Sequence, residues 1–307
     1  MSLMDDYKKE LGGDNIPAFL YHIASAPGIV RLKNIDYFCG MKYASPNLKI
    51  YRFKENPTRF DHSLTTALLT WKLTRDKNQT IAALCHDIAT PCFSHTIDYM
   101  NKDYIDQEST EEFTEKIIEM DPTLSKLFDY YNLNKKDIIN YKNYSVVDNK
   151  RPKLCADRLD GIITTGLAWI KDLNEYDIKK IVHNTSLFRN EDNELEIGFY
   201  NEDIAKLVYE TSNKINEYTH RSDDMYMMQL LAKITKLLID KGIIKYDDLY
   251  LMHEIQLIHI IKNCKDKEIL ELFQLFQNIN ENEISYNETI EIKSMNLNPL
   301  IKTKRLY

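Results

Sequence analysis

Ile81-Ala-Ala-Leu-Cys-His86-Asp87-Ile-Ala89 is an apolar run interrupted by two adjacent ionisable residues. Taking an imidazole and a carboxyl group out of water is unfavourable unless they are paired or bound to a metal ion. The run predicts a short helix from Thr80 to Asp87 that Pro91 brings to an end. Because successive helical residues diverge by about 100°, His86 and Asp87 can reach one ion together only near such an end. A buried histidine that is hydrogen-bonded to a core aspartate is the structural alternative.

The sequence on both sides of this run predicts an almost entirely helical protein. Phe60, Leu64, Leu68 and Trp71 recur at helical spacing after about Thr58. Further helices are predicted over 108–120, 123–132, 152–168, 175–184, 200–219, 224–241, 247–263 and 266–277.

Three other segments are shorter or less regular. Residues 15–45 predict one or two short helices, and residues 47–53 predict a short strand or an extended loop. Near the end of the chain, apolar residues alternate in the manner of a small terminal hairpin, at Ile284, Tyr286, Ile290 and Ile292.

The composition excludes several classes of protein. Only eight Gly and eight Pro occur in 307 residues, which argues against collagen-like chains and turn-rich β-sandwiches. Neither G-x-G-x-x-G nor G-x-x-x-x-G-K is present, so the chain lacks a glycine loop that cradles phosphates. Any phosphate recognition would therefore depend on side chains and a metal ion.

Charge and cysteine usage constrain the partners and the compartment. The net charge of −7 gives no strong sign of nucleic acid or of an anionic membrane as a partner, but it permits a small anionic substrate at a local positive site. Five dispersed Cys indicate reduced thiols and a cytoplasmic protein. No stretch approaches the roughly 20 apolar residues of a membrane span.

Two further residues complete a candidate ligand set. His62 lies on the helix expected after Thr58, and Asp157 lies on a mostly apolar helix face. With His86 and Asp87 they offer only nitrogen and oxygen donors. Such a set suits a divalent Mn, Fe, Ni, Zn or Mg ion better than an ion selected by thiolates.

The order His62, His86-Asp87, Asp157 resembles that of the HD superfamily of metal-dependent phosphohydrolases. Arg59-Phe-Asp-His-Ser-Leu64 resembles the motif R-F-x-H-S-L. The run from His86 to His95 is similar to H-D-[LI]-G-[HT]-x-P-F-S-H, a motif of the branch that contains dGTP and other dNTP triphosphohydrolases.

Two shorter motifs extend the resemblance over roughly residues 20–240. Arg31-Leu32-x-x-Ile35, followed by Gly40, resembles R-L-x-x-I-x-x-x-G, and Asp157-Arg-Leu-Asp160 is similar to D-[KR]-x-D-Y. The resemblance implies an all-α helical bundle in which His62, His86, Asp87 and Asp157 bind the metal. It also implies hydrolysis of a nucleotide or related phosphate ester by a metal-activated water.

The resemblance assigns further roles residue by residue. His95 and Asp98 match a pair that contacts the reacting phosphate and orients the water, and their spacing of three puts them on one helix face. Arg59 and Arg158 match basic positions beside the substrate phosphates, although either could form a structural salt bridge. Glu108 could assist catalysis. Tyr218 matches a tyrosine that lies near the nucleotide.

The expected organisation is an HD domain over residues 1–185, including an N-terminal segment, followed by a helical part over 186–307. The two parts are expected to pack as one unit, and a single helical domain with an appended C-terminal part is equally compatible. The helical surface also permits self-association.

Three departures from the branch pattern weaken the assignment to dNTP hydrolysis. In Asp106-Gln-Glu-Ser-Thr110, Gln107 stands where the branch motif H-E-x-x-S/T has a histidine, and glutamine cannot act as a general acid. Gly161 stands where the branch has a tyrosine. No Arg occurs between Arg189 and Arg221, so a later phosphate-binding cluster has no counterpart.

Three functions remain open on the sequence. The first is a metal-dependent phosphohydrolase acting on a nucleotide or another small phosphate ester. The second is a catalytically weak, nucleotide-binding regulatory HD protein, which Gln107 and Gly161 keep open. The third is an interaction protein that docks partners on its helical second half, and the ligand quartet disfavours it.

Overall fold

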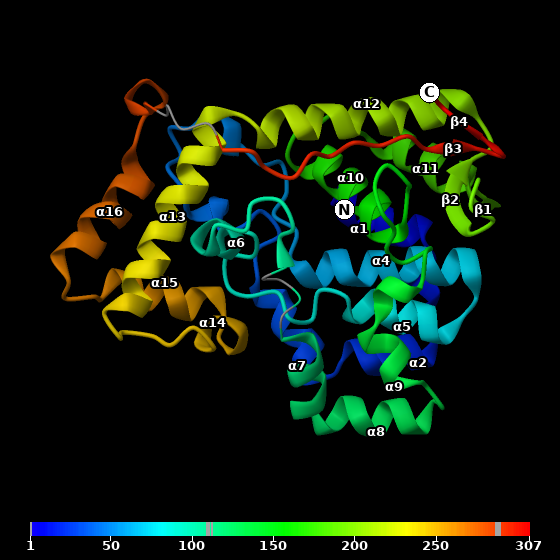
Figure 1. Cartoon of the computed structure of the whole chain (residues 1–307), viewed down its shortest axis with the longest axis horizontal. Coiled ribbons are helices and arrows are strands. Elements are labelled where there is room, and N and C mark those ends of the chain that lie inside the picture. Colours follow the sequence, from blue (N-terminus) through cyan, green and yellow to red (C-terminus); the bar gives the residue numbers. More distant parts are fainter. Residues whose placement is uncertain (1, 109–110, 112, 286–289) are drawn as a thin grey trace.

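The helix that carries His62 begins where Thr58 caps it. In the computed structural model, which describes residues 2–108, 111, 113–285 and 290–307, the Thr58 hydroxyl accepts a hydrogen bond from the Asp61 amide. The Asp61 carboxylate accepts one from the Thr58 amide in return, which satisfies two otherwise unpaired donors. Helix α4 (Arg59–Thr74) then crosses the centre of the molecule and packs against α5 (Lys77–Cys85) and α10 (Ala156–Ala168) (Figure 1).

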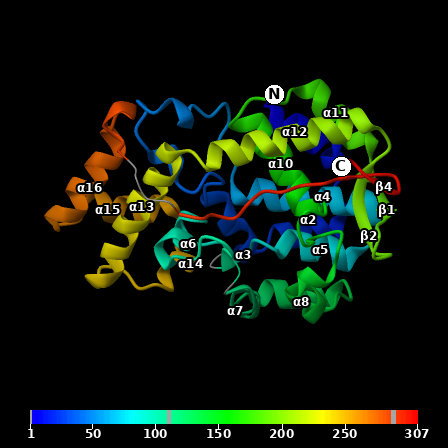
Figure 2. The ribbon, with the colours of Figure 1, turned by 45° about the horizontal axis from the view of Figure 1, so that its top comes forward.

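The other helices surround this centre. Helices α13 to α16 gather at one end of the molecule, and the strands lie at the opposite end (Figures 1 and 2). The bounds are α1 Leu3–Glu10, α2 Ala18–Ala24, α3 Pro27–Val30, α6 Thr96–Asn101, α7 Thr114–Met120, α8 Pro122–Tyr130, α9 Lys135–Ile139, α11 Glu175–Asn184, α12 Glu202–Thr219, α13 Ser222–Asp240, α14 Asp248–Leu251, α15 Glu254–Lys262 and α16 Lys267–Asn278.

A small sheet closes the end opposite α13. β1 (Thr185–Arg189) and β2 (Leu195–Phe199) form an antiparallel hairpin. β3 (Leu300–Ile301) adds parallel to β2, and β4 (Lys304–Arg305) pairs antiparallel with β3. The expectation of a mainly α-helical chain with a small terminal β element is therefore confirmed.

Several local predictions need correction. The terminal hairpin lies at 300–305 instead. Ile284, Ile290 and Ile292 are not in strands, and Ile284 and Ile292 are only partly buried. Tyr286 lies outside the described residues. Residues 47–53 contain a 3-10 turn over Lys49–Tyr51 instead of a strand. The predicted helix 247–263 is interrupted between α14 and α15, where His253 caps the second helix with Gln256.

The last described segment is a tail, residues 290–307, that runs beside α12 from the α13 end to the sheet (Figures 1 and 2). The Lys293 amide donates to the Tyr104 carbonyl (2.9 Å), and the Met295 amide donates to Asn216 Oδ1 on α12 (2.9 Å). The tail is therefore hydrogen-bonded both to the loop after α6 and to α12.

The division of the chain near residue 185 stays a prediction. In the part of the chain that the structure describes, no helix is both long enough and apolar enough for a membrane crossing.

Candidate metal centre

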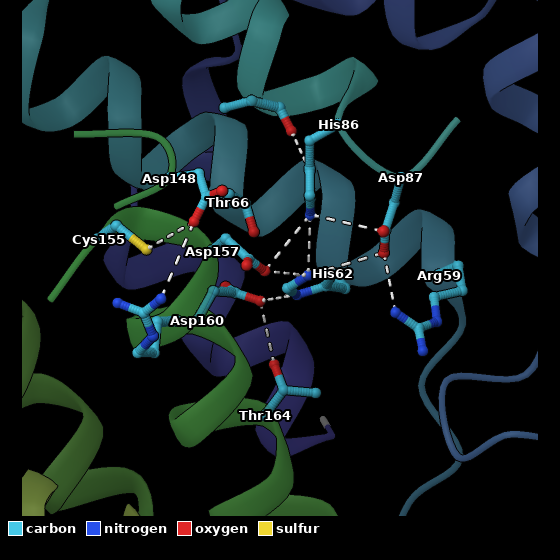
Figure 3. A network of polar contacts seen from close by, with 12 residues as sticks. Arg59, His62, Thr66, His86, Asp87, Asp148, Cys155, Asp157, Asp160 and Thr164 are labelled. Atoms are coloured by element: carbon cyan, nitrogen blue, oxygen red, sulfur yellow. Dashed lines mark hydrogen bonds and ion pairs between the residues drawn. The ribbon is translucent and has the colours of Figure 1, made fainter. Parts of the chain in front are cut away.

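His62 is held in one orientation by a buried carboxylate. Its Nδ1 lies 2.7 Å from Asp160 Oδ2 on α10, and Asp160 is fully buried and also accepts from the Tyr7 hydroxyl (2.8 Å). A carboxylate at this distance holds the imidazole proton on Nδ1. In the neutral imidazole of His62 the lone pair is then on Nε2, which faces the neighbouring acids (Figure 3).

His86 is held in the same way by the backbone. Helix α5 ends at Cys85, ahead of Pro91, so His86 and Asp87 directly follow its last turn. His86 Nδ1 lies 2.7 Å from the Ala83 carbonyl, which can only accept a hydrogen bond. In the neutral imidazole of His86 the lone pair is therefore also on Nε2.

The two Nε2 atoms and two carboxylates converge on one point (Figure 3). His62 Nε2 lies 3.2 Å from His86 Nε2 and 3.0 Å from Asp157 Oδ1, and His86 Nε2 lies 3.4 Å from that same oxygen. The Asp87 oxygens lie 3.9 and 3.8 Å from the two Nε2 atoms. His62, His86 and Asp87 offer ligand atoms all within 4.8 Å of one another. Because neutral imidazole Nε2 and ionised carboxylate are all acceptors, a cation fits this cluster.

The electrostatics of the cluster favour ionised acids. Burial alone would raise the pKa of Asp157, but His62 and His86 hold it well below its usual value. The pKa of Asp87 is likewise lowered against burial, by His86 and then by Arg59 and His62. Both aspartates are thus available as charged ligands.

Arg59 is tied to the cluster by an ion pair. Its guanidinium donates to Asp87 Oδ2 (2.9 Å) and to Ser94 Oγ (3.2 Å), and it lies over the Tyr37 ring. The arginine is nearly buried, so the ion pair is shielded from water. Arg59 lines both cavities, but part of its hydrogen-bonding capacity is used by Asp87, as in the alternative of a structural salt bridge.

His95 and Asp98 meet at the start of α6, as their spacing predicts. His95 Nδ1 lies 2.9 Å from Asp98 Oδ2, and the Asp98 side chain is fully buried while that of His95 is one third exposed. Asp98 thereby fixes the His95 ring at the edge of the cluster.

Two adjoining cavities open beside the cluster and share part of their walls. The polar cavity, of about 250 Å³, reaches His86, Asp87 and Arg158. The aromatic cavity, of about 240 Å³, reaches Phe53 and Trp169. Shared wall residues are Tyr37, Arg59, His95, Gln107, Asp157, Thr165, Ile215, Lys293 and Met295.

Two predicted residues lie elsewhere than on these walls. The Glu108 amide donates to Asp103 Oδ2 (2.8 Å), and the preceding residue, Gln107, lines both cavities instead. Tyr218 packs edge-on against Trp169 with ring centroids 5.8 Å apart. Ser109 and Thr110, at the end of the stretch that contains Gln107, lie outside the described residues.

The other predicted arginine, Arg158, lines the polar cavity but is engaged with the protein. It donates to the backbone carbonyls of Asn149 (2.7 Å) and Lys153 and lies 3.9 Å from Asp148. Asp148 itself groups with Cys155 and Asp157 beside the cluster.

The structure adds two cationic side chains that the sequence reasoning missed. Arg151 lines the polar cavity, and burial lowers its pKa to about 10. Its Nε is buried and has no hydrogen-bond partner among the described residues. Lys293, on the tail, lines both cavities and donates to the Asp106 carbonyl (3.1 Å). No local sequence signal links Lys293 to a cluster that lies so far away along the chain.

The comparisons with known proteins agree with this geometry. A family model described as HD domain matches residues 59–238, which is more than half of the chain and includes the four converging residues. A protein of Bacillus subtilis (strain 168), called Uncharacterized protein YdhJ, is 23% identical over 268 residues, which cover 85% of this chain and 76% of that protein. The match to the family model ends before the tail that carries Lys293.

Proposed function

The chain belongs to the HD domain family, and from that premise we propose that it is a metal-dependent phosphohydrolase acting on a nucleotide or a related small phosphate ester. The convergence of the Nε2 atoms of His62 and His86 with the carboxylates of Asp87 and Asp157 carries this proposal. HD domain proteins are generally metal-dependent hydrolases.

The four residues of the cluster, His62, His86, Asp87 and Asp157, would hold the ion. A divalent ion bound there would lower the pKa of a bound water and would polarise a phosphoryl oxygen. Nitrogen and oxygen ligands suit Mn, Fe, Ni, Zn or Mg. The role of the protein is to keep each imidazole in the required tautomer, through Asp160 and the Ala83 carbonyl.

The polar cavity would receive the phosphate. Arg151, Arg158 and Lys293 line it, and fixed cations stabilise the charge that spreads over phosphoryl oxygens in the transition state. His95, oriented by Asp98, keeps its Nε2 for a phosphate oxygen or the attacking water. Catalytic assistance by Glu108, a nucleotide contact by Tyr218 and self-association stay predictions.

Sequence motifs support a nucleotide as the substrate. The stretches 59–64 and 86–95 resemble the branch that contains dNTP triphosphohydrolases. The branch has a later arginine cluster that this chain lacks. Arg151 and Lys293 would supply positive charge in its place. These two side chains make a substrate with more than one phosphate group compatible with the cavity.

A catalytically weak, nucleotide-binding regulatory protein is the second candidate. Gln107 lines both cavities where the branch motif has a histidine that transfers protons. Gly161 lines the polar cavity where the motif has a tyrosine. Neither residue can donate a proton as a general acid.

The test combines metal analysis with a substrate screen. The purified protein is assayed for bound metal and then for hydrolysis of dNTPs, NTPs, nucleoside monophosphates and a generic phosphodiester with each of the five metals. We expect turnover of at least one of these esters, and loss of both metal and turnover in Asp87→Ala. Asp240→Ala, which removes an exposed aspartate paired with Lys236, is the matched control and should retain both.

Two results would contradict the proposal in different ways. Tight nucleotide binding without turnover of any ester would favour the regulatory alternative. Full metal occupancy in Asp87→Ala would show that this residue is not a ligand.

A further inference from the structure

The aromatic cavity has a wall of ring side chains that the hydrolytic step does not require. Phe38 and Phe53 stack with centroids 4.5 Å apart, and Trp169 meets both edge-on at 5.6 and 5.9 Å. Tyr51 completes this wall beside Trp169. The same cavity is bounded by Arg59, so its contents adjoin the metal cluster.

A buried carboxylate, Asp224 on α13, belongs to the same wall. It is 6% exposed, and its Oδ1 accepts a hydrogen bond from the Tyr51 hydroxyl (2.8 Å). Its Oδ2 has no hydrogen-bond partner in the described part of the chain. Burial raises the pKa of Asp224 to about 7, against the opposing effect of the Tyr51 hydrogen bond.

The nearby arginine does not neutralise this carboxylate. Arg221 gives two hydrogen bonds to the adjacent Asp223, at 2.9 and 2.7 Å. Within the described residues, no Lys or Arg nitrogen lies at ion-pair distance from Asp224. Asp224 Oδ2 can therefore accept a hydrogen bond from a donor group that occupies the cavity.

We propose that the aromatic cavity binds the organic part of the substrate, and that Asp224 selects a planar nitrogen heterocycle bearing an amino group. The rings of the wall favour a flat π-system, since aromatic side chains stack on the faces of planar bases. Above about pH 7, where Asp224 is ionised, its carboxylate only accepts hydrogen bonds, so it favours rings that present N–H groups. A volume of about 240 Å³ gives room for one ring system.

This inference rests on the proposed function for the phosphate end of the substrate, and its test reads binding instead of turnover. The chain has two Trp, so Trp71→Phe leaves Trp169 as the reporter of the aromatic cavity. Fluorescence titrations of this variant are made in EDTA with two pairs of nucleotides that differ by one amino group. The pairs are GMP with IMP, and AMP with purine riboside 5′-monophosphate.

We expect at least one amino nucleotide to bind about tenfold more tightly than its partner. Asp224→Asn, which offers N–H donors where the carboxylate accepted, should reduce that ratio to about one. Asp223→Asn is the matched control, because it alters the neighbouring carboxylate and should keep the ratio.

Equal binding within both pairs, or no saturable change in Trp169 fluorescence, would overturn the inference. Binding of phosphoethanolamine in preference to all four nucleotides would also overturn it, by identifying a cage for a saturated cationic amine. Retained selectivity in a protein that hydrolyses none of the screened esters would support this inference while contradicting the proposed function.

Discussion

At the scale of single residues, the candidate centre depends on Asp160, which does not face the metal cluster itself. This aspartate fixes the proton of His62 on Nδ1 and is in turn held by the Tyr7 hydroxyl. A histidine ligand whose other nitrogen is bound to a carboxylate is both oriented and made more basic. Tyr7 lies on α1, so the first helix of the chain supports a ligand on α4.

Asp160→Asn is expected to weaken metal binding while leaving all four ligands in place. The amide keeps an acceptor for His62 but loses the charge, and loss of such a partner lowers metal affinity by about 10- to 100-fold. Titration of the metal-free protein with Mn²⁺ or Zn²⁺, read by calorimetry, measures the change.

Tyr7→Phe is the control for this variant. It removes the hydrogen bond from the Tyr7 hydroxyl to Asp160 and keeps the carboxylate, so metal affinity should change much less. An unchanged affinity in Asp160→Asn would show that the tautomer of His62 does not depend on this contact.

The sequence anticipated the cluster better than its surroundings. His62, His86, Asp87 and Asp157 stand in recognisable motifs, and the structure brings these four together. Arg151 and Lys293 could not be predicted, because their places on the cavity wall follow from tertiary packing and from the path of the tail. In the sequence, Gln107 is marked only by the absence of a histidine, whereas in the structure it lies on the wall of both cavities.

At the scale of elements, helices were predictable where apolar spacing and caps coincide. Helix α11 has the predicted bounds 175–184, and Asn174 caps it. Strands β1 and β2 were missed although Leu195, Ile197 and Phe199 alternate, because each strand has only five residues and a short hairpin is stabilised mainly by its packing. The break between α14 and α15 at Met252 was missed because no Gly or Pro marks it.

The sheet also anchors the tail through a buried ion pair. Glu196 on β2 is fully buried and accepts from Arg305 at 2.6 and 2.9 Å. The same carboxylate accepts from the Leu154 amide and from the Asn190 side chain. Arg305 therefore links β4, β2 and the segment that precedes α10.

Arg305→Ala is expected to lower the free energy of unfolding by about 3 kcal/mol, because it leaves a buried carboxylate without its cation. Urea denaturation followed by circular dichroism measures this change. Adding Glu196→Gln to Arg305→Ala should restore part of the loss, since the unpaired charge is removed. Arg189→Ala, at an exposed strand end, is the control, and an equal loss there would refute the explanation.

At the scale of the whole molecule, a buried acid joins the second half of the chain to the loop that follows the metal ligands. Glu254 at the start of α15 accepts from the Asp36 amide (3.0 Å) and the Phe93 amide (3.1 Å). Lys42 lies 3.5 Å from its other oxygen. Burial, together with the nearby charge of Asp36, raises the pKa of Glu254 to about 7.

This shift predicts a pH dependence of stability with a definite sign. Above a pH of about 4.5 the unfolded chain releases the Glu254 proton, whereas the folded protein keeps it until about pH 7. The unfolded state thus binds fewer protons in this window, so the contribution of Glu254 to stability falls as the pH rises from 4.5 to 7 and is constant outside it.

Glu254→Gln should abolish that contribution while keeping an acceptor for both amides. Between pH 4.5 and 8, the free energy of unfolding of the variant should rise by about 1–3 kcal/mol relative to that of the wild type. Urea denaturation across this range measures it. Glu268→Gln, an exposed acid paired with Lys241, should show no such change, and parallel pH curves for Glu254→Gln and wild type would contradict the prediction.

The tail beside α12 is also synthesised later than the metal cluster. The ribosome makes residues 290–301 after α4, α5 and α10, which carry or adjoin every residue of the metal cluster. Lys293 and Met295 are therefore the last residues of both cavity walls to be synthesised, so the walls are complete only after every residue of the metal cluster has been made.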